Sequence, residues 1–170
     1  VKYTDWALGN FIDEAREQPW FNDTMFVLVA DHTSNGRGRT DLPPENYRIP
    51  LIIWAPSFIQ PQQFNDLASQ IDVAPTVLGL LNLPYTSEFF GQDIRQSAAH
   101  YQRAFMANYL TVGYLQDNKI VQLMPKQKPM VVDAQSGSKL DATPNNQPLT
   151  DAAQAYYQSA AEALRQLKGK

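Results

Sequence analysis

The chain has 170 residues, 44% of them hydrophobic and 18% charged, which is the composition of a globular protein rather than a disordered one. Its formal charge of −3 gives no basic surface of the kind that binds nucleic acid. The absence of cysteine excludes disulfides, thiolate metal sites and a cysteine nucleophile. No apolar run approaches the roughly 20 residues of a membrane span. The sequence begins with Val1 rather than methionine, as expected of a piece of a longer chain.

The first part of the chain is predicted to alternate helices and strands, the pattern of an α/β fold. Residues 4–17 place their apolar side chains on one helical face, with Thr4 as the expected cap, and Pro19 follows the end. Residues 25–30 and 48–56 contain apolar runs without alternation. Such runs favour strands covered on both faces, as in a parallel sheet.

The later elements have different patterns. Residues 70–84, "QIDVAPTVLGLLNLP", predict a helix with Asp72 at its cap and Pro84 as its stop. Residues 105–133 contain two β-rich runs and the start of a third, with a turn at "QDNK", which predicts a small antiparallel meander. Residues 150–168 predict a C-terminal helix, capped by its first or second residue.

A carboxylate and an imidazole follow the first predicted strand. The segment "MFVLVADH" ends in Asp31 and His32, and sites in α/β sheets lie beyond the carboxyl ends of strands. Aspartate and neutral histidine suit Mn²⁺, Zn²⁺ or Fe²⁺. The dipeptide alone leaves a structural alternative open, in which Asp31 caps a turn and His32 is partly exposed. In the next loop, Arg37 and Arg39 are candidates to bind a phosphate, sulfate or lipid head group, and a solvated basic loop is the alternative.

Three segments in this order resemble one family. They are "TMFVLVADHT", "YRIPLIIWAP", and "QIDVAPTVLGLLNLP" followed by "FFGQDI". Together they resemble the alkaline phosphatase superfamily in its sulfatase-like branch, and within it the phosphoglycerol transferases and lipoteichoic acid synthases. The resemblance covers roughly residues 3–95, and the order and spacing of the segments are more specific than any one of them.

The resemblance implies a fold and a metal site. The implied fold is α/β, with a partial alkaline-phosphatase-like core of mostly parallel sheet and flanking helices in residues 1–100. A small antiparallel sheet and a terminal helix are expected in residues 101–170. Asp31 and His32 match two of the family's metal ligands, with Mn²⁺ favoured and Zn²⁺, Mg²⁺ or Ca²⁺ as alternatives. The family's nucleophile and first acidic ligand precede these motifs, so no catalytic nucleophile is expected in this chain.

The expected function is that of a C-terminal fragment of a metal-dependent phosphoglycerol transferase or sulfatase-like enzyme, inactive by itself. The alternatives are a sulfatase and a non-catalytic interaction module that retains the fold. The expected partners are the missing N-terminal half of the domain and a phosphate or sulfate ester. Self-association through an exposed sheet edge is a further prediction. Nucleic acid is not an expected partner. The resemblance also implies a membrane-anchored parent whose catalytic domain faces the periplasm or the outside, the fragment itself being soluble.

Overall fold

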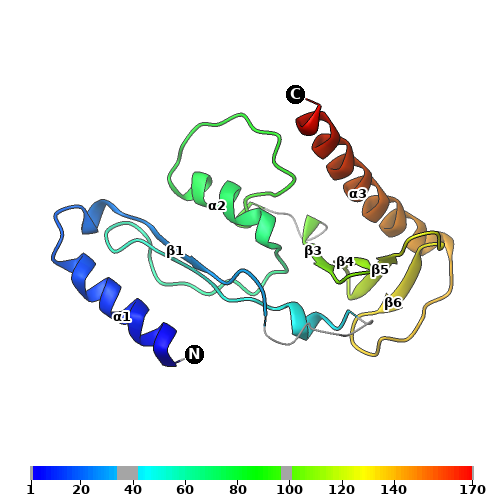
Figure 1. The fold of residues 1–170 in the computed structure, drawn as a ribbon, viewed down its shortest axis with the longest axis horizontal. Helices are drawn as coiled ribbons and strands as arrows, with labels where there is room; N and C mark the ends of the chain where they lie inside the picture. The colour runs from blue at the N-terminus through cyan, green and yellow to red at the C-terminus, as the bar shows by residue number, and fades with distance from the viewer. Residues whose placement is uncertain (1, 34–41, 97–100, 170) are drawn as a thin grey trace. The chain divides into compact units, whose positions relative to one another are not determined.

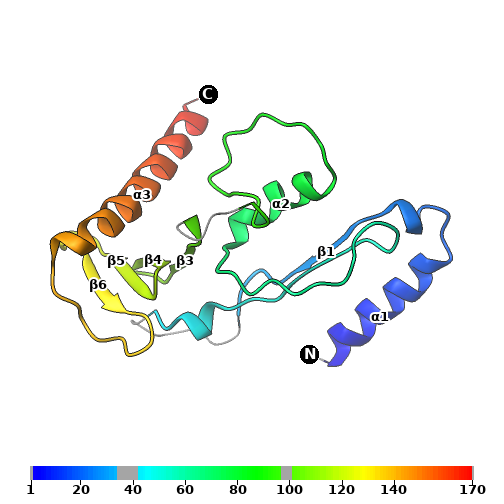
Figure 2. The same cartoon turned by 180° about the vertical axis from the view of Figure 1, so that it is seen from behind.

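The structure is a computed structural model that describes residues 2–33, 42–96 and 101–169 (Figures 1 and 2). The chain divides into two compact units, Val1–Asp31 with Ile49–Phe64 and His32–Arg48 with Asn65–Lys170. These bounds differ from the two domains expected from the sequence, residues 1–100 and 101–170. The division into those two domains stays a prediction. The helices and strands are α1 (Lys2–Arg16), β1 (Phe26–Val29), β2 (Leu51–Trp54), α2 (Val73–Leu80), β3 (Ala104–Ala107), β4 (Val112–Gln116), β5 (Lys119–Leu123), β6 (Met130–Asp133) and α3 (Gln147–Lys168).

The first unit packs α1 against the β1–β2 pair through aromatic rings. The Phe26 ring on β1 stacks on Trp54 of β2, with 5.2 Å between the ring centroids. It meets Phe11 of α1 edge-on at 6.2 Å. Phe26 is buried, as is Ala15 of α1. The predicted helix at residues 4–17 is confirmed, although α1 already begins at Lys2, which places Thr4 inside the helix rather than at its cap.

The strands β1 and β2 form an antiparallel pair, with Phe26 opposite Trp54 and Val29 opposite Leu51. Every described strand pair is antiparallel, so the prediction of a mostly parallel sheet is wrong for the described part of the chain. The reason is that a continuous apolar run indicates a buried strand but does not show whether that strand is parallel or antiparallel to its neighbour. The mixed α/β class itself, with an antiparallel sheet and a C-terminal helix, is confirmed.

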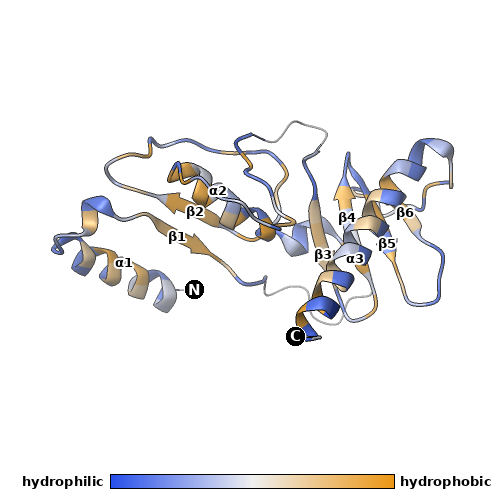
Figure 3. Cartoon of the chain, turned by 90° about the horizontal axis from the view of Figure 1, so that it is seen from above, coloured by the Kyte–Doolittle hydropathy of each residue, from blue (hydrophilic) through white to orange (hydrophobic). Residues whose placement is uncertain are grey.

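The strand pair is also less buried within this chain than its sequence predicts. Phe26 is buried, but Val27, Val29 and Ile52 are exposed. Figure 3 shows β1 and β2 coloured as apolar segments. Both strands therefore present apolar side chains that the described residues do not cover.

The second unit contains the predicted meander, with four strands in the order β3-β4-β5-β6 rather than three. The additional strand arises because a tight turn at residues 108–111 divides the first β-rich run in two. The predicted turn at "QDNK" is confirmed: Asp117 and Asn118 both have a positive φ, of 50° and 58°. Two such residues in succession are typical of the tight turn that suits the twist of a hairpin.

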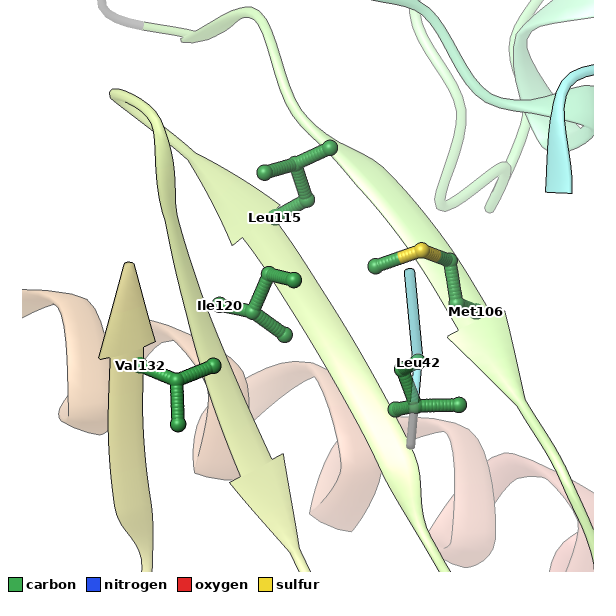
Figure 4. Packing of buried hydrophobic residues seen from close by; sticks show 5 residues of the cluster. All are labelled: Leu42, Met106, Leu115, Ile120 and Val132. Atoms are coloured by element: carbon green, nitrogen blue, oxygen red, sulfur yellow. The ribbon is translucent and has the colours of Figure 1, made fainter. Parts of the chain in front are cut away.

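The two faces of this sheet pack against different partners, as strand alternation requires. One face carries the apolar cluster of Figure 4, which is Leu42, Met106, Leu115, Ile120 and Val132. The opposite face meets α3, where Tyr114, Val121 and Val131 surround Ala153. Helix α3 begins earlier than predicted, because a 3-10 helix at Pro144–Asn146 leads directly into it. Its N-cap residue is Asn146, which makes no side-chain capping bond, rather than residue 150 or 151.

Candidate metal site and the buried ion pair

The candidate metal ligands follow β1 directly. Backbone pairing continues one residue past the strand, because the Ala30 N–H donates to Pro50 O at 3.3 Å. Asp31 and His32 come next, and both are exposed. The boundary between the two compact units falls between these two residues. The predicted position of the pair at a strand end is thus observed, and their shared role remains a proposal.

The imidazole of His32 is oriented by the backbone that follows it. Its Nδ1 lies 2.9 Å from Thr33 O, within hydrogen-bond distance. If Nδ1 carries the proton of this bond, Nε2 carries the lone pair that a metal ion binds. The Thr33 hydroxyl in turn donates to the carbonyl of Asn46, within the 3-10 helix Pro44–Tyr47. The segment after the pair is therefore tied to a second segment of the chain.

The other sequence candidates cannot be placed. Arg37 and Arg39 lie outside the described residues, as does His100. Within the described ranges, no group of three or more His, Cys, Asp or Glu side chains is arranged to hold a metal ion. A carboxylate and an imidazole suit a divalent ion chemically, but zinc sites, for example, use at least three protein ligands. Asp31 and His32 therefore fit as part of a donor set rather than as a complete one.

A buried ion pair that the sequence analysis missed lies in the second unit. Arg103 donates through Nη1 to Asp72 Oδ2 at 2.8 Å and through Nη2 to Asp72 Oδ1 at 2.9 Å. The two side chains are only 2% and 1% exposed. The carboxylate also accepts the backbone N–H groups of Ser69 and Gln92. With both oxygens engaged in this way, Asp72 is a structural residue and not a metal ligand.

The predicted cap role of Asp72 is therefore only partly right. Asp72 stands at the N-cap of α2 but makes no side-chain bond to that helix. Its carboxylate instead belongs to the capping box that Ser69 starts for the 3-10 helix Gln70–Asp72. It holds that helix to Arg103, immediately before β3. The only sequence signal for this contact is an arginine placed directly before an apolar strand.

Aromatic rings complete the surroundings of the Arg103 guanidinium. Its central carbon lies 5.4 Å from the Phe105 ring centroid and 5.6 Å from that of Tyr156. Burial by itself lowers the pKa of Arg103, but the hydrogen bonds to Asp72 and Tyr156 outweigh it and raise that pKa. Burial, together with the nearby Tyr156, raises the pKa of Tyr114 to about 12. This cluster joins β3, β4 and α3 and stabilises the fold.

No described helix is both long enough and apolar enough to cross a membrane.

Comparison with known proteins shows which family the chain resembles. Residues 1–83 match the family model described as Sulfatase. The lipoteichoic acid synthase-like protein YvgJ of Bacillus subtilis is 28% identical over 111 residues, which cover 55% of this chain and 18% of that protein.

Two solved structures share the fold. A protein of the alkaline phosphatase superfamily from Vibrio parahaemolyticus is 30% identical, with a TM-score of 0.81 over 96% of this chain and 41% of that one. The lipoteichoic acid synthase LtaP from Listeria monocytogenes is 20% identical, with a TM-score of 0.69 over 96% of this chain and 44% of that one. The chain spans less than half the length of each of these three relatives. By these matches the chain resembles the sulfatase-like branch of the alkaline phosphatase superfamily.

Proposed function

We propose that this chain is the C-terminal part of the catalytic domain of a metal-dependent enzyme that transfers or hydrolyses phosphate or sulfate esters. The observation that supports this most is the match to the Sulfatase family model over residues 1–83, because this segment contains Asp31 and His32. In this proposal the two side chains supply a carboxylate oxygen and an imidazole nitrogen to a divalent ion, with Mn²⁺ favoured. When bound, the ion polarises the ester and stabilises the negative charge that develops on the reacting oxygens.

The contribution of this chain is then to hold two ligands at the end of a paired strand. Because they are consecutive residues, one short backbone segment sets the position of both. The contact between His32 Nδ1 and Thr33 O favours the tautomer needed for binding through Nε2. Arg37 and Arg39 are proposed to bind the phosphate or sulfate oxygens. The remaining ligands and the nucleophile come from sequence outside this chain, so the chain alone is inactive.

The favoured reaction is phosphoglycerol transfer, because one relative is described as lipoteichoic acid synthase-like. A sulfatase is the second candidate, which the description of the matching family model favours. In either case the relatives suggest a membrane-anchored protein whose catalytic domain faces the periplasm or the cell exterior. A non-catalytic module that retains the fold is the third reading.

The test uses the full-length protein with three substrates: a phosphatidylglycerol analogue, an aryl phosphate and an aryl sulfate. Cleavage of one of them should fall by at least about a hundredfold in Asp31→Ala and in His32→Ala, since even residues that only orient a metal ligand contribute 10–100-fold. Asp66→Ala, which removes an exposed carboxylate outside the proposed ligand pair, is the matched control and should retain activity. Wild-type activity in both ligand variants would overturn the assignment, and inactivity of the wild type on all three substrates would favour the non-catalytic reading.

A further inference from the structure

One end of the four-stranded sheet carries two turns that lie close to each other. The strand pairing shows this: Ala107 is opposite Val112, so residues 108–111 form the turn between β3 and β4. Val112 is also opposite Leu123, so the connection of residues 124–129 leaves the sheet at the same end. We call these two segments, 108–111 and 124–129, the sheet tip.

The first turn of the sheet tip displays two large apolar side chains to solvent. Tyr109 is 97% exposed and Leu110 is 65% exposed. The turn is fixed rather than loose, because Asn108 Oδ1 accepts the N–H groups of Leu110 and Thr111 at 3.0 and 2.9 Å. The Asn108 N–H also donates to Thr111 O. The sheet therefore holds an aromatic ring and a leucine outward, where they are not buried by the described residues.

The second turn adds positive charge. It contains Lys126 and Lys128, and both are exposed. Lys126 has a φ of 60°, a conformation that glycine favours, so a lysine occupies a position where a small residue is usual. Between residues 101 and 132 the sequence has one acidic residue, Asp117, and this residue lies in the β4–β5 turn at the opposite end of the sheet.

We propose that the sheet tip docks on an anionic lipid surface, with Tyr109 and Leu110 entering the head-group region and the two lysines contacting lipid phosphates. An exposed aromatic side chain and a leucine near lysines are a combination that binds membrane surfaces. The burial of the apolar side chains and the attraction of the lysines to anionic head groups both contribute to the binding free energy. A projecting turn suits a soft planar surface, which needs no complementary groove. The chain as a whole carries −3, so attraction to such a surface is confined to a local basic end of the molecule. This inference does not depend on the metal site.

The first test measures co-flotation of the 170-residue chain with vesicles of phosphatidylcholine, alone or with about one-third phosphatidylglycerol, at low salt, where charge attraction is weakly screened. Binding should require phosphatidylglycerol. The double variant Tyr109→Ser, Leu110→Ser should bind at least about tenfold less, from the lost apolar burial. The double variant Lys126→Gln, Lys128→Gln should also bind at least about tenfold less, from the lost attraction to the lipid.

Matched controls remove the same groups elsewhere in the same unit. Tyr157→Ser, Leu167→Ser removes two exposed apolar side chains of α3. Lys139→Gln, Lys168→Gln removes two exposed lysines that are not part of the sheet tip. Both control variants should bind as the wild type does. Coincident urea unfolding curves for all variants would show that the changes act on the surface and not on the fold.

A second test locates the contact, since a single introduced cysteine can be labelled selectively in a chain that has none. A polarity-sensitive fluorophore at Leu110→Cys should shift to the blue with phosphatidylglycerol vesicles, and the same label at Tyr157→Cys should not. Absence of vesicle binding by the wild type would overturn the proposal. Unchanged binding of both sheet-tip variants, or a response at residue 157 and not at 110, would do so as well.

Discussion

At the scale of single residues, the strongest structural contact is the ion pair of Asp72 and Arg103. Both charges are taken out of water, and each is compensated by the other and by backbone groups. The stability of such a pair depends on keeping both partners, because the removal of one leaves an unpaired buried charge. Arg103→Met should therefore lower the free energy of unfolding by about 3–5 kcal/mol in urea titrations.

The control for this prediction is an exposed pair of the same chemical type. Arg165 and Glu162 lie 2.6 Å apart on α3, with side chains 74% and 51% exposed. Arg165→Met should change the free energy of unfolding by less than about 1 kcal/mol, as is usual for surface pairs. Equal effects of the two substitutions would show that burial does not decide the contribution of the Asp72–Arg103 pair.

Two glycines make a second matched comparison. A Cβ atom at Gly91 would lie 1.9 Å from the backbone oxygen of Ile71, whereas one at Gly9 would meet nothing within 4 Å. Gly91→Ala should lower the free energy of unfolding by about 1–3 kcal/mol, because the backbone must shift. Gly9→Ala, inside α1, should raise it by about 0.5–1 kcal/mol through helix propensity. Thermal or urea unfolding measures both, and a harmless Gly91→Ala would show that this close approach is not required.

The hydroxyl of Tyr114 gives a pH-dependent prediction. Its pKa is raised from 10.0 to about 12, so its neutral form stabilises the folded state. That contribution is complete below pH 10 and is lost as the pH rises through about 12. The free energy of unfolding should fall by up to about 2 kcal/mol across this range, and the fall should be smaller in Tyr114→Phe. Identical pH slopes in the wild type and the variant would contradict the assignment.

The position and the partners of a residue could be predicted only where its neighbours in the sequence determine them. Asp31 and His32 follow a recognisable strand, and the structure places them at its end. The partnership of Asp72 with Arg103 joins residues 31 positions apart, and no local pattern encodes it. Asp72 was predicted to be a helix cap because an aspartate directly before a helical pattern is by itself typical of an N-cap.

At the scale of elements, the helices and strands followed from periodicity, and strand direction did not. The apolar run of β1 correctly predicted a strand, but its pairing with β2 is antiparallel. The meander was predicted well because hairpins depend on local turn signals such as Asp117 and Asn118. Burial of β1 and β2 was overestimated, because it depends on contacts with other segments, and the described residues do not cover these strands.

The uncovered strands lead to a prediction for the isolated chain. Val29 and Ile52 are exposed on a two-stranded sheet whose outer edges have no described strand partner. Such edges promote pairing with another chain. Light scattering of the isolated chain should show a mass that rises with concentration, and Val29→Lys, Ile52→Lys should shift it towards the monomer.

The control for self-association is Leu164→Lys, Leu167→Lys, which adds the same charges at exposed apolar positions of α3, in the other compact unit. It should leave the association unchanged. A wild-type chain that stays monomeric at high concentration and unfolds in one cooperative transition would contradict the role given to these strands.

At the scale of the whole molecule, we propose that the chain is part of a larger active domain. The chain covers 41% and 44% of the two solved relatives, although 96% of it matches each of them. The superfamily generally relies on divalent metal ions, and we propose Asp31 and His32 as part of a donor set for one. The family resemblance and the fold class were predictable because three motifs in a fixed order carry them. The substrate was not, because the nucleophile and most substrate contacts of the family lie outside these motifs.

The central claim is that Asp31 and His32 hold a catalytic metal ion, and metal content tests it most directly. The full-length protein, purified and dialysed against Mn²⁺, should retain about one ion per chain by elemental analysis, as a single-ion site requires. Asp31→Ala and His32→Ala should each lose most of that ion, whereas His100→Ala, which removes the other histidine of these 170 residues, should retain it. Full metal content in both ligand variants would contradict the account.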